Sequence, residues 1–177
     1  MMDEGLRVGS AEGSTSDALR NVGASELEQL YRDAGPQLWR SIYGFAGGRR
    51  DVADDAVAEA FARAIERVST IREPLAWIYR TAFRIASHEL RSERRQPPPM
   101  PDPVPGLDAG DLHDVFRALG TLSPNQRAAV LLHDSEGFTS VEIGRMLGIA
   151  AATARVHVFR ARRRLRDQQR SEEDRDG

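Results

Sequence analysis

A row of arginines follows a short capped helix near the C-terminal end of the sequence, and this combination can bind the phosphates and base edges of nucleic acid. The segment 138–165 reads FTSVEIGRMLGIAAATARVHVFRARRRL. Thr139 and Glu142 have the spacing of a capping box, which predicts that a helix begins here. Gly148 follows that helix, where a C-cap favours a residue that tolerates positive φ. A second helix is expected from about Ala151, and the two together predict a helix-turn-helix.

The second helix has an apolar stripe that would face inward and a basic surface beside it. The stripe consists of Ala154, Val158, Ala161 and Leu165. Arginines occupy much of the remaining surface, and no acidic residue lies between Thr153 and Arg166. A charge run is often only a solvated face, so an ordinary helical hairpin is the alternative. The capped helix and the glycine turn directly before the run favour DNA binding.

Composition narrows the classes of protein that the chain can belong to. Its 177 residues carry a formal net charge of −2, so the basic character is local. The chain has no cysteine, which excludes disulfides and cysteine-based zinc sites, and no nucleophile–base pair appears. We therefore expect no catalytic residue, metal or cofactor, because metal-ligand spacing is also absent among His88, His113, His133 and His157. Without a long apolar run or a signal pattern, a cytoplasmic protein with no membrane insertion is expected.

Helical periodicity predicts an all-α fold of two small helical domains, of which the C-terminal one carries the helix-turn-helix. The stretch QPPPMPDPVPGLDAG predicts an extended, proline-rich linker between them. Ser25 is expected to cap the first helix, and Pro36 to lie at a bend or a helix start. Ser123 and Gln126 form a second capping box. The expected division is a disordered tail over 1–23, a first domain over 24–95, the linker over 96–111, a second domain over 112–170 and a charged tail over 171–177.

An acidic face is expected on the helix predicted over residues 49–68. Like charges four residues apart repel, so this face does not stabilise the helix. A solvated surface is one interpretation, and a metal or acid–base site is disfavoured because no histidine motif accompanies the carboxylates. A docking surface for a basic protein partner is the functional alternative. The residues concerned are Asp51, Asp55, Glu59 and Glu66, with Asp54 nearby.

Aromatic and basic residues are interleaved on the helix predicted from Leu75 to about Arg95. Trp77, Tyr79 and Phe83 alternate there with arginines. Rings stack on bases while arginines follow the phosphates, a combination that suits single-stranded nucleic acid. A core position is the alternative for Trp77, because an aromatic residue at helical spacing more often packs inward.

In the order of these parts, residues 26–165 resemble bacterial RNA polymerase sigma factors of the extracytoplasmic-function (ECF) type. The stretch ALGTLSPNQRAAVLLHDSEGFTSVEIGRMLGI, followed by TARVHVFRARRRLR, resembles the promoter-binding C-terminal region of that family. DVADDAVAEAFARA resembles its polymerase-docking helix. PLAWIYRTAFRIASHELRSERR resembles the segment that melts and reads the −10 element. The direct linker between the two regions is similar to that of the ECF type.

The resemblance implies three surfaces, each with a partner. Core RNA polymerase, through its β and β′ subunits, would dock on Asp54, Asp55, Glu59 and Phe61. The −10 promoter DNA would contact Arg72, Trp77, Tyr79, Arg80, Arg84 and Arg91. The −35 DNA would contact Thr153, Arg155, Val156, Phe159, Arg160, Arg162 and Arg163, of which the last two would bind mainly phosphates. An anti-sigma factor is a further partner that the resemblance alone implies.

The sequence thus predicts a sigma factor, rather than an enzyme, that directs polymerase to promoters. One alternative is a plain helix-turn-helix regulator without polymerase, which would favour a dimer on a palindromic site. That alternative leaves the acidic helix and the aromatic-basic helix unexplained. The other alternative is a degenerate sigma-like module that sequesters a partner.

Overall fold

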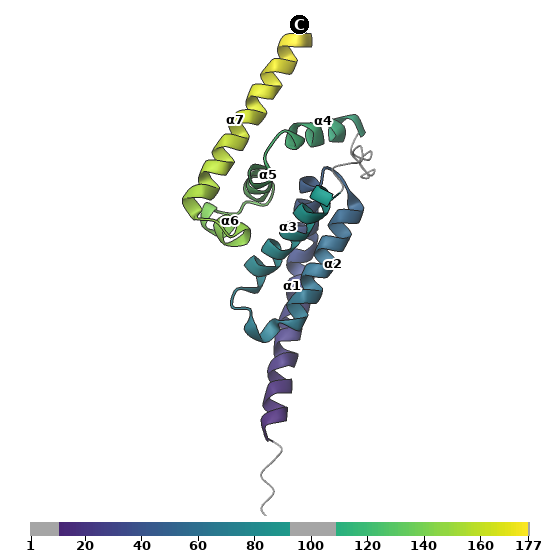
Figure 1. Ribbon diagram of the computed structural model, residues 1–177, viewed down its shortest axis with the longest axis vertical. Coiled ribbons are helices and arrows are strands. Elements are labelled where there is room, and N and C mark those ends of the chain that lie inside the picture. The colour runs from purple at the N-terminus through teal and green to yellow at the C-terminus, as the bar shows by residue number, and fades with distance from the viewer. Residues whose placement is uncertain (1–10, 93–108, 177) are drawn as a thin grey trace, which may run out of the picture.

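The computed structural model describes the backbone of residues 11–92 and 109–176, and the side chains of residues 25–92, 110 and 112–171. Almost all of this described chain is helical, which agrees with the predicted all-α fold (Figure 1). In chain order the elements are α1 (Ala11–Phe45), α2 (Arg50–Glu66), η1 (Val68–Thr70), α3 (Pro74–Ser92), α4 (Ala109–Gly120), α5 (Pro124–Val130), η2 (Leu131–Ser135), α6 (Ser140–Leu147) and α7 (Ala151–Asp176).

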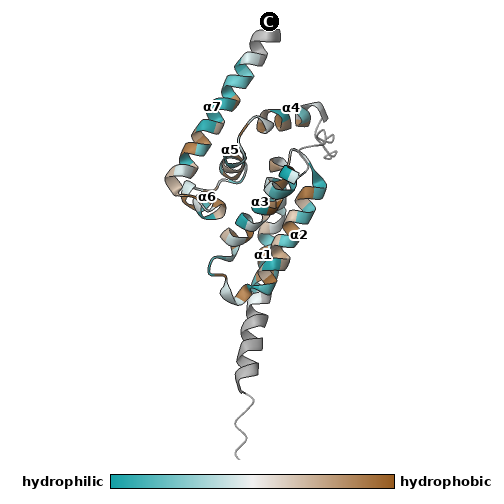
Figure 2. Cartoon of the chain, viewed as in Figure 1, coloured by the Kyte–Doolittle hydropathy of each residue, from teal (hydrophilic) through white to brown (hydrophobic). Residues whose placement is uncertain are grey.

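The helices α1, α2 and α3 form an N-terminal bundle. Polar and apolar residues alternate around them (Figure 2), as expected for amphipathic helices that bury one face. The predicted inward stripe of α2 is confirmed at Val57, Phe61 and Ala64, which are at most 6% exposed. Four small residues on α2 are fully buried or nearly so, and their size lets the neighbouring helices approach closely: Ala53, Ala56, Ala60 and Ala64.

The long first helix differs from its prediction in two respects. It begins at Ala11, so the disordered tail expected through Gly23 is wrong for residues 11–23, whereas residues 1–10 lie outside the described chain. Ser25 therefore lies within the helix instead of capping it, and Pro36 is also internal. Proline removes one backbone hydrogen bond and usually ends a helix. Packing of α1 on α2, η1 and α3 outweighs that local preference.

The helices α4 to α7 form the C-terminal half, and its local signals are confirmed. Ser123 and Thr139 each accept a hydrogen bond in a complete capping box, with Gln126 and Glu142 as the reciprocal partners. A π-helical turn, η2, continues α5 without a break. The helix α7 runs through Asp176, so the tail expected from residue 171 is helical to that point. The helix α4 begins inside the expected linker, of which residues 96–108 lie outside the described chain.

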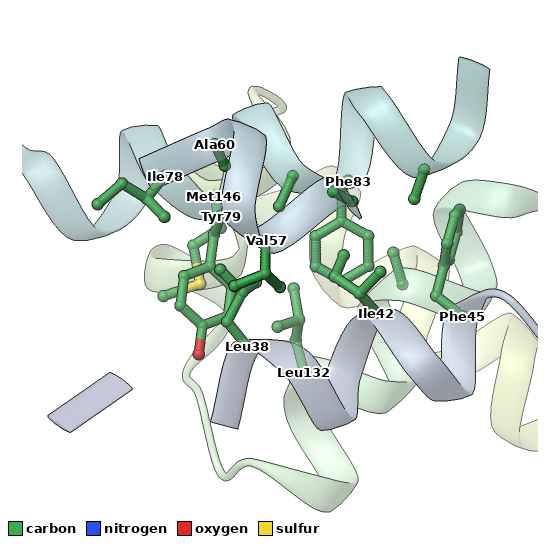
Figure 3. Close-up of a cluster of buried hydrophobic side chains, with 14 of the residues drawn as sticks. Leu38, Ile42, Phe45, Val57, Ala60, Ile78, Tyr79, Phe83, Leu132 and Met146 are labelled. Carbon is green, nitrogen blue, oxygen red and sulfur yellow. The ribbon is translucent and has the colours of Figure 1, made fainter. Parts of the chain in front are cut away.

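The two halves pack directly against each other and share one core. The helix α6 lies on α3, while η2 and α5 lie on α1. Leu132 and Met146 of the C-terminal half are enclosed among Leu38, Ile42 and Tyr79 of the N-terminal bundle (Figure 3). Leu132 is fully buried and Met146 is 2% exposed. The arrangement therefore juxtaposes the two halves rather than holding them apart as independent units.

Candidate nucleic-acid and polymerase interfaces

The turn between α6 and α7 depends on two glycines. Gly148 has a φ of 69° and ends α6, which confirms the predicted C-cap. A Cβ added at Gly144 would lie 2.8 Å from the carbonyl oxygen of Ile149 and 3.2 Å from the backbone nitrogen of Ala151. Only glycine permits this close approach of two backbone segments. Gly144 was not predicted from the sequence, because the contact exists only once the turn has folded.

The helix α7 presents the predicted −35 residues on its open side. Its inward stripe is confirmed, since Ala154 and Ala161 are fully buried and Val158 is 5% exposed. Phe159 is 63% exposed and Val156 is 44% exposed, so two apolar side chains face outward. The polar members of the predicted set are exposed on the same helix: Thr153, Arg155, Arg160 and Arg163.

Arg162 is held in an ion pair. Its Nε donates to both carboxylate oxygens of Asp134, at 3.1 and 3.0 Å, and its Nη2 contacts the same carboxylate. His133 lies beside the pair, with Nδ1 2.8 Å from Asp134 Oδ1. Partial burial raises the pKa of Asp134, but the hydrogen bonds from Arg162 and His133 outweigh it and hold that pKa below its ordinary value. The pair ties α7 to η2, so a structural contact occupies the arginine that was predicted to bind phosphate.

Some of the residues predicted to contact the −10 element are exposed to solvent, and others are covered by neighbouring side chains. Arg84 and Arg91 are exposed, as is Arg72 before the helix, and Trp77 is half-buried. Arg80 is exposed, but its guanidinium donates to the carbonyl oxygen of Arg145 at the end of α6.

Tyr79 is placed differently from its prediction. It is fully buried, and its ring packs edge-to-face on Phe138 with 5.5 Å between the ring centroids. Burial, with the nearby charge of Glu136, raises the pKa of the Tyr79 hydroxyl above its ordinary value. The expectation that Tyr79 faces DNA is therefore wrong for this conformation, because both the N-terminal bundle and the C-terminal half cover the ring (Figure 3).

The acidic face of α2 is exposed to solvent, and a hydrogen bond orients one of its carboxylates. Asp54, Asp55 and Glu59 are exposed, as predicted for a docking surface. Trp39 of α1 donates from Nε1 to Asp54 Oδ1 at 2.7 Å. Phe61 is different, since it is only 6% exposed and packs edge-to-face on the Tyr31 ring with 4.9 Å between centroids. Phe61 therefore packs in the core beneath the exposed carboxylates and is not part of the exposed surface.

A cavity of about 430 Å³ lies at the junction of α3, α5 and α6. Arg80, Arg84 and Arg91 line it, together with Asn125 and Leu147. None of its lining residues is acidic, so the three guanidinium groups give the junction a positive potential. Three of the predicted −10 arginines thus meet at the seam between the two halves.

Within residues 11–92 and 109–176, no helix is both long and apolar enough to cross a membrane. The same described residues contain no group of three or more histidine, aspartate or glutamate side chains that is arranged to hold a metal ion.

Sequence comparisons relate both halves to known families. Residues 30–96 match the family described as Sigma-70 region 2, and residues 112–165 match Sigma-70, region 4. The ECF RNA polymerase sigma factor SigM of Mycobacterium tuberculosis is 32% identical over 147 residues, which cover 78% of this chain and 74% of SigM. The chain belongs to the family of ECF RNA polymerase sigma factors.

The chain matches two further ECF sigma factors over only part of their length. SigE of Mycolicibacterium smegmatis is 30% identical over 155 residues, covering 79% of this chain and 60% of SigE. SigJ of Mycobacterium tuberculosis is 35% identical over 156 residues, covering 78% of this chain and 48% of SigJ. The ECF sigma factor described here therefore spans only part of the length of these two relatives.

Two solved structures share its fold. The sigma factor RpoE from Bartonella quintana, crystallised with the anti-sigma factor NepR, superposes with a TM-score of 0.69 at 22% identity, over 82% of this chain and 97% of RpoE. CnrH, solved with the cytosolic domain of CnrY, gives the same TM-score and identity over 87% of this chain and 96% of CnrH. At 22% identity, both likenesses concern the fold.

Proposed function

We propose that this ECF sigma factor binds core RNA polymerase through α2 and directs it to promoters, with α3 at the −10 element and α7 at the −35 element. The outward face of α7 carries the proposal. Phe159 is 63% exposed between Arg155 and Arg160, both of which are also exposed. An aromatic or aliphatic side chain can meet a thymine methyl group while arginine forks onto guanine, so this face suits base readout in the major groove.

The open carboxylates of α2 support the polymerase part of the proposal. Asp54, Asp55 and Glu59 present negative charge from one helix, and a basic groove on the β or β′ subunit would complement it. A plain DNA-binding regulator has no use for such a face. The carboxylates therefore favour a sigma factor over that alternative.

The matches to two Sigma-70 regions support a division of labour along the chain. Residues 24–95 would form the −10 and polymerase-binding unit, and residues 112–170 the −35 unit. The complex of RpoE with NepR supports an anti-sigma factor as a further partner. Since polymerase and promoter DNA are its proposed partners, the place of action would be the cytoplasm, and the protein would contribute no catalytic group of its own.

The proposal is tested by transcription in vitro. Purified core polymerase would be incubated with fragments of the source genome, with and without this protein, and the transcript starts mapped. We expect new starts that share a spaced two-part sequence motif. Stable binding to core polymerase without new starts would indicate a module that sequesters polymerase, and absence of core binding would indicate a plain DNA-binding regulator.

A further inference from the structure

Four polar side chains of α3 form a row along the cavity at the junction of α3, α5 and α6. They recur every three or four residues, which places them on one stripe of the helix: Arg80, Arg84, Ser87 and Arg91. All four line the cavity, and none of its lining residues is acidic. Within the described chain, no carboxylate forms an ion pair with any of these three arginines. The stripe therefore presents three positive charges to one cavity without a paired counter-charge.

The cavity is bounded by closely packed apolar side chains. Phe45 and Phe83, which both line it, meet edge-to-face with 5.2 Å between ring centroids and are 2% and 5% exposed. Next to Phe45, a Cβ added at Gly44 would lie 3.2 Å from Cδ2 of Leu131, so the two halves fit tightly there. The volume of about 430 Å³ falls in the range of small-molecule pockets, about 300–1,000 Å³. The cavity therefore has firm walls and room for a small ligand.

Arg80 is oriented before any ligand arrives. Its guanidinium donates to the carbonyl oxygen of Arg145, and its Nε would lie 3.3 Å from a Cβ added at Gly148. The group thus lies against the turn between α6 and α7. A guanidinium has five N–H donors, so a single backbone contact leaves others for an anion. A side chain that is already held in place loses less conformational entropy on binding.

The wall that the C-terminal half contributes is uncharged. Asn125 of α5 lines the cavity there, and its side-chain amide can donate to an anion. Pro124 and Leu147 add apolar surface. The cavity therefore combines cations from α3 with a neutral donor and apolar surface from α5 and α6, a composition typical of small-molecule sites that bind a polar ligand.

The charge of the stripe favours a ligand with more than one phosphate group. A guanidinium can bind a phosphate group through two parallel hydrogen bonds. A phosphate monoester carries about −1.5 to −2 charges at pH 7, so one alone would not balance three guanidinium groups. We propose that this cavity binds a small anion with two linked phosphate groups, either free or attached to a nucleoside. The site goes beyond the proposed function because its ligand is a small molecule, although it shares three arginines with the proposed −10 surface.

Calorimetric titration of the full chain tests the site with inorganic pyrophosphate and with ADP, and adenosine serves as the uncharged comparison. We expect one molecule of either probe to bind per chain with a Kd of about 100 μM or tighter, and adenosine not to bind. Tighter binding of ADP would assign a nucleoside diphosphate, whereas equal or tighter binding of pyrophosphate would assign the free diphosphate. Absence of binding by both probes up to about 1 mM would overturn the proposal.

Removal of one charge from the stripe locates the bound anion. Arg84→Gln should weaken binding of the probe at least about tenfold, because it removes a charge-assisted contact. Arg163→Gln is the matched control, since it removes the same charge from the exposed arginines of α7, and should change the affinity less than about twofold. Arg84→Gln with wild-type affinity, or an equal loss in both variants, would show that the anion binds the basic surface at large and would overturn the site.

Addition of one negative charge tests the wall from the C-terminal half. Asn125→Asp should weaken binding at least about fivefold, because the new carboxylate repels the anion. Gln169→Glu adds the same charge on α7, outside the lining residues, and should change the affinity less than about twofold. Asn125 is exposed, so the variant should keep its helices, which circular dichroism verifies. Wild-type affinity in Asn125→Asp would overturn the site. A wild-type protein that binds the probe and directs no transcription would instead count against the proposed function alone.

Discussion

The indole of Trp39 donates from Nε1 to Asp54 Oδ1 at 2.7 Å, and this hydrogen bond links α1 to the acidic face of α2. The same ring stacks on Tyr43 at 5.0 Å between centroids with an interplanar angle of 10°. The guanidinium carbon of Arg50 lies 5.4 Å from the centroid of the Trp39 ring. A ring packed in this way has little rotational freedom, so the Asp54 carboxylate is held in one orientation before polymerase arrives. Preorganisation of this kind reduces the entropy lost on binding.

Trp39→Phe should weaken binding of core polymerase by about 1 kcal/mol, because it removes the donor to Asp54 and keeps most of the ring contact. Titration of labelled protein with core polymerase gives the affinity directly. Trp77→Phe, which changes a half-buried side chain of α3, is the matched control and should bind core polymerase as wild type does. Unchanged affinity of Trp39→Phe would show that the orientation of Asp54 does not matter for docking.

Arg155→Ala and Arg160→Ala should each lower affinity for the selected −35 sequence by roughly 1–3 kcal/mol and relax the preference at one base position. Both side chains are exposed on the reading face of α7. Competition binding against single-base variants of the duplex would reveal the affected position. An equal loss on every sequence would show that the two arginines contact phosphates instead.

Arg163→Ala should behave differently, since Arg163 was predicted to bind phosphate. Its contact with Asp167 is long, 3.9 Å, between exposed side chains, so it gives little competition. We expect a uniform loss across sequences and a salt dependence reduced by about one unit of slope. Measurement of binding at several salt concentrations provides the slope. A change in sequence preference would contradict this assignment.

Gly144→Ala should destabilise the C-terminal half by roughly 1–3 kcal/mol, because overpacked backbone must shift to accept the added methyl group. The new Cβ would lie 2.8 Å from the Ile149 carbonyl oxygen. Denaturant unfolding compares the variant with Gly120→Ala, whose Cβ meets nothing within 4 Å. If both variants had the same unfolding midpoint, the turn would be more tolerant than its geometry indicates.

The Asp134–Arg162 pair should make stability depend on acidity. Since the folded protein holds the pKa of Asp134 below its ordinary value, the stabilisation is present above pH about 4 and is lost as the pH falls through the lower folded pKa. Asp134→Asn removes the titrating group, so the difference in unfolding free energy between wild type and variant should shrink on acidification. The capping box with Thr139 also holds the pKa of Glu142 below its ordinary value, so Glu142→Gln should remove a second, separate stabilisation that is lost on acidification. If the difference in unfolding free energy between wild type and Asp134→Asn stayed constant with pH, the Asp134–Arg162 pair would not contribute to the pH dependence of stability.

The parts of the fold that sequence predicted well are those fixed by neighbours in the chain. Thr139 with Glu142, and Ser123 with Gln126, form their capping boxes within four residues, and Gly148 takes the positive φ that its place demands. Such signals are complete within one helical turn, so no distant contact can easily override them. Helical periodicity likewise placed the inward stripe of α7 correctly.

The errors arose where distant contacts decide the outcome. Pro36 was expected at a bend or a helix start, and the helix start is wrong, because α1 packs on two other helices and continues through this residue. Tyr79 sits on a basic, aromatic helix in a pattern typical of nucleic-acid contact, but Phe138, almost sixty residues later in the sequence, covers its ring. The ion pair between Asp134 and Arg162 is equally non-local. No window of the sequence contains these pairings, because the tertiary fold creates them.

The fit of Gly44 against Leu131 also bears on how such a protein can evolve. A Cβ added at Gly44 would lie 3.2 Å from Cδ2 of Leu131, so a substitution there would press on the packing between the two halves and on none of the residues proposed to read DNA. Substitutions at Gly44 would therefore change how the halves fit together while the proposed base-contacting residues of α7 are inherited unchanged.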